Sequence, residues 1–161
     1  MAVEARRKPQ ITYDPAVLDE INRSIVRELH ADARLPMAEL GRRVGLSPPA
    51  VAERVQRLEA AGVIAGYHAE INPKAIGYPV SAVVRVRPIA AQLRTIADLA
   101  RKSPEVVECY RITGEDCFLM RLELRSLEDL EEILDRFVPL GQTTTSLIHS
   151  APVEPRLPPI D

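Results

Sequence analysis

Apolar residues in the first third of the chain recur every three or four positions, the spacing that gathers them on one face of a helix. Three such stripes lie between residues 18 and 58: Leu18, Ile21, Ile25 and Leu29; Leu40 and Val44; and Val51, Val55 and Leu58. They predict a helix from about 14 to 31, beginning at Asp14-Pro15, and two short helices within 36–61. All three would pack together through their apolar faces.

The residue types between the last two helices predict a tight turn. Gly45 can take the left-handed conformation that ends a helix, Ser47 is a favoured N-cap, and Pro48 suits the first helical position. Segment 62–71 follows with glycines and alternating apolar residues, which indicates a β-wing. Three helices and a wing are typical of a winged helix-turn-helix.

The third predicted helix has an exposed face that suits the major groove of DNA. Small residues near its start permit close approach, and long polar side chains further along can reach base edges or phosphates. The predicted DNA-binding residues are Arg42, Arg43, Ser47, Pro49, Ala50, Glu53, Arg54, Gln56 and Arg57. The pattern leaves another interpretation open, because many helical hairpins bind no nucleic acid and Glu53 can simply pair with Arg57 at i, i+4.

Beyond a turn signal at 72–79, interpreted as a linker, strands alternate with helices. Predicted strands cover 80–86, 106–113, 117–125 and 142–150, and predicted helices cover 91–102 and a segment capped by Ser126. The order β-α-β-β-α-β is that of the split-βαβ, or ferredoxin-like, fold. The expected fold class is α+β, with a winged helix-turn-helix domain at 14–71 and a ferredoxin-like domain at 80–151. A flexible arm at 1–13 and a Pro-rich tail at 152–161 flank them.

A sheet of this kind carries both helices on one face and leaves the other face open. The predicted strands offer apolar residues at both odd and even positions, in segments 80–86, 106–112 and 118–124. An apolar open face would need a cover, and a second copy of the sheet provides one. The pattern therefore predicts a homodimer formed through this domain.

Charge is distributed unevenly along a chain whose formal net charge is −2. Residues 1–66 hold ten Lys/Arg and nine Asp/Glu, whereas residues 67–161 hold eleven and fourteen. The basic surface is local and modest, so one copy should bind DNA weakly and two or more copies should bind better. Arg6, Arg7 and Lys8 could touch phosphates, although a short basic terminus is more often simply mobile.

The sequence lacks the signals of membrane proteins, secreted proteins, metal-binding proteins and enzymes. There is no apolar run of the ~20 residues that span a bilayer and no secretory signal at the N-terminus, so no membrane partner and a cytoplasmic location are expected. The two cysteines form no disulfide framework, and the three histidines are scattered without metal-ligand spacing. No nucleophile is paired with a base and no phosphate loop is present, so an enzyme is not expected.

These segments together resemble the Lrp/AsnC family, the leucine-responsive or feast/famine transcriptional regulators, over residues 14–151. The resemblance rests on Leu18-Asp19, segment 31–34, Glu39-Leu40, the run GLSPPAVAERVQRLEAAGVIAGYHAEINP at 45–73, and Thr113-Gly114-Glu115-Asp116 with Leu119. It implies an N-terminal winged helix-turn-helix that binds double-stranded promoter DNA. It also implies a C-terminal effector domain of the RAM type, which dimerises and often assembles further into octamers or related rings.

The resemblance further implies an effector site at the hairpin before Cys117. In the family, a glycine there lets a small molecule, usually an amino acid, approach backbone N–H groups, and an aspartate meets its ammonium. Carried onto this chain, the effector-binding residues are Thr113, Gly114 and Asp116, with Thr143, Thr144, Thr145 and Ser146 as partners from a neighbouring subunit. Such groups suit a zwitterion. The residues alone fit an ordinary hairpin turn and an ordinary strand equally well.

The expected function is that of a sequence-specific DNA-binding transcriptional regulator. A small molecule, most simply an amino acid, would modulate its assembly or its DNA affinity, and no other cofactor is expected. The alternative is an architectural DNA-binding protein whose C-terminal domain only oligomerises. The two differ in one observable, because a ligand that binds the folded state raises the melting temperature.

Overall fold

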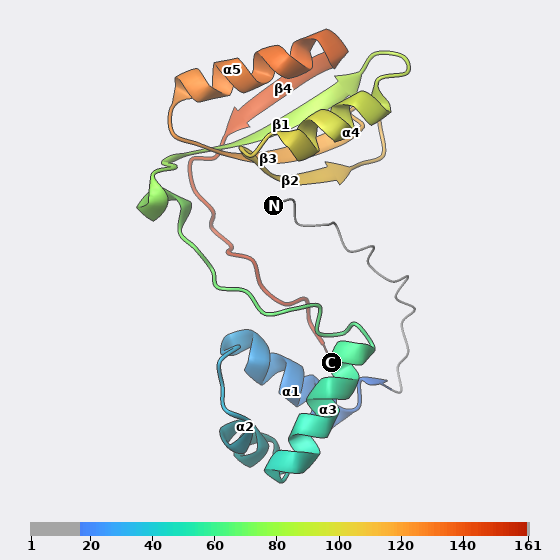
Figure 1. Cartoon of the computed structure of the whole chain (residues 1–161), viewed down its shortest axis with the longest axis vertical. Coiled ribbons are helices and arrows are strands. Elements are labelled where there is room, and N and C mark those ends of the chain that lie inside the picture. Colours follow the sequence, from blue (N-terminus) through green and yellow to red (C-terminus); the bar gives the residue numbers. More distant parts are fainter. Residues whose placement is uncertain (1–16, 161) are drawn as a thin grey trace. The chain divides into compact units, whose positions relative to one another are not determined.

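The computed structural model describes residues 17–160 and divides the chain into two compact units (Figure 1). The second unit spans Glu70–Glu154, and the first comprises the described residues before it together with the residues from Pro155 onward. Each unit has its own cluster of buried apolar side chains. No helix within 17–160 has the length and apolarity that crossing a bilayer requires.

The first unit is built from helices α1 (Glu20–Ala31), α2 (Met37–Val44) and α3 (Pro48–Ala60). Their contact surface confirms the predicted stripes, because the buried cluster is Ile25, Leu29, Leu35, Leu40, Val51, Val55 and Leu58. Leu18, Ile21 and Val44 complete it as partly buried neighbours. Burying an aliphatic side chain of this size stabilises the fold by about 1.5–3 kcal/mol, so these stripes hold the three helices together.

Helix α1 begins later than the sequence predicted. Asp19, not Asp14, caps it, and the Asp19 side chain accepts a hydrogen bond of 2.7 Å from the backbone N–H of Asn22. Asp14 and Pro15 lie outside the described residues. Asp19 carries the same capping group as Asp14 and stands next to the first buried turn, so the helix starts there.

The turn between α2 and α3 follows the predicted residue types. Gly45 has a φ of 72° and ends α2, and Ser47 occupies the N-cap of α3 with Pro48 as the first helical residue. The Ser47 side chain makes no capping hydrogen bond. Gly41 brings α2 against this turn, since a Cβ there would lie 2.6 Å from the Leu46 carbonyl oxygen.

The predicted β-wing is wrong, because residues 62–71 contain no strand. A wing needs two paired strands, and within the described residues nothing pairs with this segment. Its apolar residues pack instead on the helices: Val63 and Ile64 lie against the first cluster. The Tyr67 hydroxyl donates a 2.7 Å hydrogen bond to Glu59 on α3.

The second unit contains β1 (Val80–Pro88), α4 (Leu93–Lys102), β2 (Val106–Arg111), β3 (Phe118–Leu124), α5 (Leu127–Phe137) and β4 (Gly141–Leu147). Short 3-10 turns at Pro73–Ile76 and Val138–Leu140 precede β1 and β4. The sheet order is β2-β3-β1-β4 with every pair antiparallel, which confirms the ferredoxin-like topology. Helix α4 starts two residues later than predicted, and the last strand ends three residues earlier.

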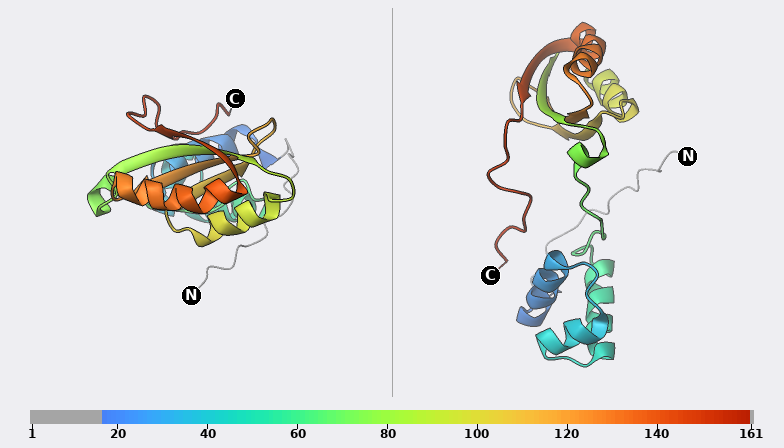
Figure 2. Two further views of the ribbon diagram at one scale, coloured as in Figure 1. Left: turned by 90° about the horizontal axis from the view of Figure 1, so that it is seen from above. Right: turned by 90° about the vertical axis from the view of Figure 1, so that its left-hand side faces the viewer.

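Helices α4 and α5 cover the same face of the sheet (Figures 1 and 2). Alternate residues of β1 and β3 point into the layer between sheet and helices and are buried there: Ala82, Val84, Val86, Phe118, Met120, Leu122 and Leu124. Ile96 and Ala100 on α4 and Leu130, Ile133 and Phe137 on α5 close this core from the other side.

The opposite face of the sheet is not apolar, contrary to the sequence prediction. Its central positions are Ser81, Val83, Arg85 and Arg87 on β1 and Leu119, Arg121 and Glu123 on β3. Glu123 is only 6% exposed. It pairs with Arg121 and accepts a 2.6 Å hydrogen bond from Ser81. We call this surface the open face; it combines a few apolar side chains with a network of charges.

Candidate nucleic-acid interface and ligand site

One stripe of α3 faces away from the core of the first unit. Pro49, Glu53, Gln56 and Arg57 are exposed along it, because they lie opposite the buried Val51, Val55 and Leu58 on the helical wheel. Ser47 is exposed at the start of the helix, and Ala50 is half-buried at the edge of the stripe. This part of the predicted DNA-binding set therefore shares one accessible surface.

Arg54 does not belong to that surface, which corrects the sequence prediction. Its Nη1 donates to Asp19 Oδ2 at 2.6 Å and to Asn22 Oδ1 at 3.0 Å. The Arg54 side chain is only 23% exposed, and it ties α3 to the capped start of α1. The hydrogen bonds from Arg54 and from the Asn22 backbone hold the pKa of Asp19 below its ordinary value. Helical spacing could not reveal this link, since it joins residues 35 positions apart.

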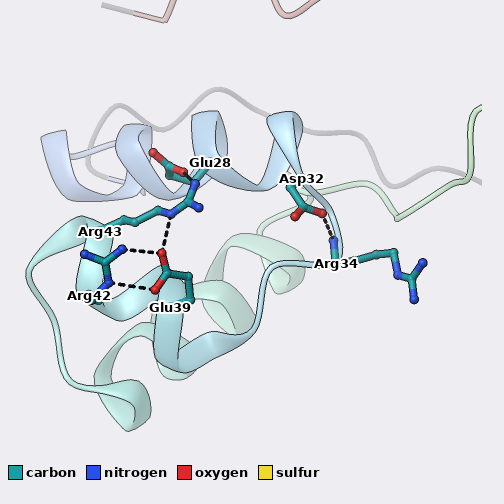
Figure 3. Close-up of polar contacts among 6 residues, drawn as sticks. All are labelled: Glu28, Asp32, Arg34, Glu39, Arg42 and Arg43. Carbon is teal, nitrogen blue, oxygen red and sulfur yellow. Dashed lines mark hydrogen bonds and ion pairs between the residues drawn. The ribbon is translucent and has the colours of Figure 1, made fainter.

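Arg42 and Arg43 on α2 share a carboxylate, as Figure 3 shows. Arg42 donates to both oxygens of Glu39 at 2.8 and 2.6 Å, and Arg43 donates to Glu39 at 3.0 Å and to Glu28 on α1 at 2.7 Å. These hydrogen bonds lower the pKa of Glu39 to about 2. Arg43 thus bridges α1 and α2, whereas Arg42 keeps 74% of its side chain exposed. Arg34 points away from this cluster (Figure 3).

Arg57 and Glu53 make the i, i+4 pair that the sequence allowed. Their closest atoms, Arg57 Nη2 and Glu53 Oε1, are 3.7 Å apart, and the side chains are 64% and 69% exposed. A pair this open to water contributes little to stability. Both side chains can therefore exchange this contact for a contact with a polyanion.

The hairpin between β2 and β3 turns at Gly114, whose φ is 101°. A Cβ at Gly114 would meet nothing within 4 Å, so the turn is open to solvent. Asp116, 22% exposed, lies 3.2 Å from Arg85 and 3.6 Å from Arg87, which also pairs with Glu115. Arg85 and Arg87 were not predicted as site residues from the sequence. Their signal was the Val-Arg-Val-Arg alternation of β1, which puts both guanidiniums on the open face.

The hydroxyl-rich strand β4 divides between the two faces of the sheet. Thr144 stands opposite Arg85 and Ser146 opposite Val83, so both lie on the open face beside the hairpin's ion pairs. Thr143 and Thr145 stand opposite the buried Val86 and Val84 and face the helices. Within one chain, the structure therefore groups Asp116, Arg85 and Thr144 and separates Thr143 and Thr145 from them.

The described residues hold no group of three or more His, Cys, Asp or Glu side chains that could bind a metal ion. Cys109 and Cys117 are free thiols. The two candidate sites therefore consist of arginines, carboxylates, hydroxyls and backbone N–H groups, which can bind charged and polar ligands.

Two family models match the chain. Residues 18–59 match the AsnC-type helix-turn-helix domain, and residues 81–158 match the Lrp/AsnC ligand binding domain. The first match covers the three helices of the first unit, and the second covers the whole sheet with its two helices.

Similar proteins include the HTH-type transcriptional regulator LrpC of Bacillus subtilis, which is 39% identical over 133 residues, 83% of this chain and 92% of LrpC. The solved structure of LrpC superposes with a TM-score of 0.81 and 37% identity over 86% of this chain and 99% of that chain. The regulator LrpA of Mycobacterium tuberculosis is 42% identical over 120 residues, 74% of this chain and 80% of LrpA.

A further solved structure is a feast or famine regulatory protein from M. tuberculosis complexed with L-methionine. It has a TM-score of 0.80 and 37% identity over 87% of this chain and 97% of that chain. Both units are thus found together in transcriptional regulators, and one similar structure was solved with L-methionine.

Proposed function

The chain belongs to the Lrp/AsnC family of HTH-type transcriptional regulators, and we propose that an amino acid bound to its second unit changes how its first unit engages promoter DNA. The family consists of regulators, not enzymes. The observation that carries the amino-acid proposal is the charged group at the hairpin, where Asp116 lies against Arg85 and Arg87 on the open face. This role places the protein in the cytoplasm, together with the DNA that it binds.

On the DNA side, the outward stripe of α3 reads the major groove. Gln56 and Arg57 have the reach and the donors for base edges, while Ser47, Pro49 and Ala50 allow the start of the helix to approach closely. Arg42, largely exposed at the surface of α2, is suited to a phosphate. Glu53 would have to turn away from the polyanion or release Arg57 to it.

On the ligand side, a zwitterion matches the charges at the hairpin. Its carboxylate would take the place of Asp116 against Arg85 or Arg87, and its ammonium would take the place of an arginine against Asp116. Each charged group loses one partner and gains another, so the exchange leaves no buried charge unpaired. Thr144 beside Arg85 and the open backbone at Gly114 supply further polar contacts.

A thermal-shift screen of the twenty amino acids, followed by calorimetry on each that binds, tests this site. An amino acid that binds the folded protein should raise its melting temperature, and neither its amide nor its N-acetyl derivative should do so. Asp116→Asn should weaken binding about tenfold or more, because it removes a charge-assisted contact. Glu131→Gln, an exposed carboxylate on α5, is the matched control. Failure of every amino acid to bind would favour the architectural alternative.

We further infer that the open face joins two copies of the chain. Tyr110 stands opposite Leu119 on this face, and its side chain is 51% exposed. Pairing of two open faces would cover this side chain. Two copies would also bind DNA more tightly than one, because the basic surface of a single helix-turn-helix unit is modest. Light scattering at micromolar concentration measures this assembly and any larger ring that it builds.

A further inference from the structure

A cavity of ≈ 230 Å³ lies within the second unit, away from the hairpin. It is lined by Tyr78, Pro104, Glu105, Arg125, Asp129 and Glu132. Glu105 directly precedes β2 and Arg125 directly follows β3, whereas the hairpin joins the other ends of these two strands. The length of β3, at ~3.3 Å per residue, separates the two places by roughly 20 Å.

The carboxylate of Glu105 is incompletely satisfied in this cavity. One oxygen, Oε1, accepts from Arg136 at 3.3 Å. The other, Oε2, is buried without a hydrogen-bond partner, and across residues 17–160 it is the only buried side-chain oxygen or nitrogen in that condition. Leaving a polar atom buried and unpaired costs free energy, and the cost is larger for a charged group. A donor that enters the cavity would remove this cost.

Arg125 does not neutralise the acidic side of the cavity. Its guanidinium lies over the Tyr78 ring, 5.5 Å from the centroid, and its Nη2 is 3.5 Å from the Tyr78 hydroxyl oxygen. Among the described residues, no ion pair joins Arg125 to Glu105, Asp129 or Glu132. The lining of the cavity therefore contains three carboxylates and one guanidinium, while Arg136 pairs with Glu105 Oε1 and the Arg125 backbone N–H donates to Asp129 Oδ2 at 3.1 Å.

We propose that this cavity binds a small organic cation, with a primary ammonium or guanidinium group donating to Glu105 Oε2. The lining has more carboxylates than cations, so a positively charged ligand is favoured. A bare metal ion is not favoured, because the described residues provide no cluster of metal ligands. The site is separate from the hairpin and does not depend on the amino-acid site proposed there.

Basic amino acids and diamines both carry such a cation, and Arg125 should bind them differently. A basic amino acid would place its carboxylate on Arg125 and its side-chain cation on Glu105. A diamine has no carboxylate, so Arg125 would only repel it. Arg125→Gln should therefore weaken the binding of lysine or arginine and strengthen the binding of putrescine or agmatine.

Calorimetry on the full-length protein with L-lysine, L-arginine, putrescine and agmatine tests the proposal, with norleucine and citrulline, whose side chains are uncharged, as comparators. We expect saturable binding of one cation per chain that depends on Glu105, and no Glu105-dependent binding of the comparators. Glu105→Gln should weaken binding about tenfold or more, because an amide replaces a charged acceptor. Glu132→Gln, an exposed change that leaves folding intact, should also weaken it. Glu131→Gln, on the same helix but outside the cavity, should change nothing.

Asp116→Asn separates this proposal from the hairpin site. It should leave cation binding unchanged. Cation binding that Asp116→Asn abolishes and Glu105→Gln does not would place the ligand at the hairpin and overturn the cavity site. Absence of Glu105-dependent binding, or equal Glu105-dependent binding of the cations and of norleucine and citrulline, would overturn the proposal and mean that water alone satisfies Glu105.

Discussion

At the scale of single residues, two arginines of the same helix have different tasks. Arg54 is directed inward to Asp19 and Asn22, where it fixes α3 against α1. Arg57, three residues further on, lies on the exposed stripe and is held only by a long contact with Glu53. Sequence alone placed both on the binding face, because a helical wheel gives the angle of a residue and not the reach of a long side chain.

Arg54→Ala should therefore change the stability of the protein, and Arg57→Ala should change its DNA affinity. Arg54→Ala should lower the free energy of unfolding by about 1 kcal/mol, since it removes hydrogen bonds to a partly exposed carboxylate and an amide. Arg57→Ala should leave stability unchanged and weaken DNA binding by about 1–3 kcal/mol. Thermal melts and fluorescence anisotropy on both variants measure this, with the exposed Arg94→Ala on α4 as control. If Arg54→Ala weakens DNA binding without lowering the melting temperature, its side chain contacts DNA.

Glu39 predicts how the first unit responds to acid. Hydrogen bonds from Arg42 and Arg43 lower the pKa of Glu39 to about 2 in the folded protein, below the ordinary value of 4.5. A carboxyl whose folded pKa is depressed stabilises the fold above its unfolded pKa, and this stabilisation is lost as the pH falls toward the folded value.

Glu39→Gln should thus be less stable than the wild type at neutral pH, and the difference should shrink between about pH 5 and about pH 2. Urea unfolding at a series of pH values, followed by circular dichroism, gives the two curves. A difference that stays constant over this range would contradict the ion-pair assignment.

At the scale of elements, capping and turn residues explain why the helix ends and turns were predictable. Gly45, Pro48, Asn72-Pro73 and Ser126 each carry a local signal, and the helix ends and turns lie close to where those signals put them. The β-wing failed because a strand needs a partner, and alternation in one segment does not provide it. The prediction that the open face is apolar failed for a related reason. Periodicity cannot show that Arg121 and Glu123 pair with each other on this face of β3.

Gly41 occupies a position that leaves no room for a side chain. It is buried in α2, and an added methyl group would lie 2.6 Å from the Leu46 carbonyl oxygen, a backbone atom that cannot rotate away. Gly41→Ala should destabilise the protein by about 1–3 kcal/mol through overpacking, despite the better helix propensity of alanine. Chemical denaturation measures the change. Ala38→Gly, an exchange in the opposite direction on the same helix, should cost about 1 kcal/mol by loss of propensity alone. A Gly41→Ala variant as stable as the wild type would show that the turn adjusts freely.

At the scale of the whole molecule, the division into a helical reading unit and a sheet unit was predictable, because helical spacing gives way to strands near residue 79. The proposed ligand site at the hairpin was predictable only in part. The Thr-Gly-Glu-Asp turn was identified by resemblance, but Arg85 and Arg87 come from a strand about thirty positions earlier, and sheet register alone brings them to Asp116. Register also decides that Thr144 shares this surface and Thr143 does not.

Whether an amino acid controls DNA binding can be measured by anisotropy of a labelled DNA from upstream of the protein's own gene, titrated with and without each amino acid. We expect DNA binding that weakens steeply with salt, and a change in DNA affinity of roughly 5–150-fold with at least one amino acid. Asp116→Asn should abolish that change while leaving DNA binding in the absence of ligand intact. DNA affinity that no amino acid alters, or that an amino acid alters equally in Asp116→Asn, would contradict the proposed function.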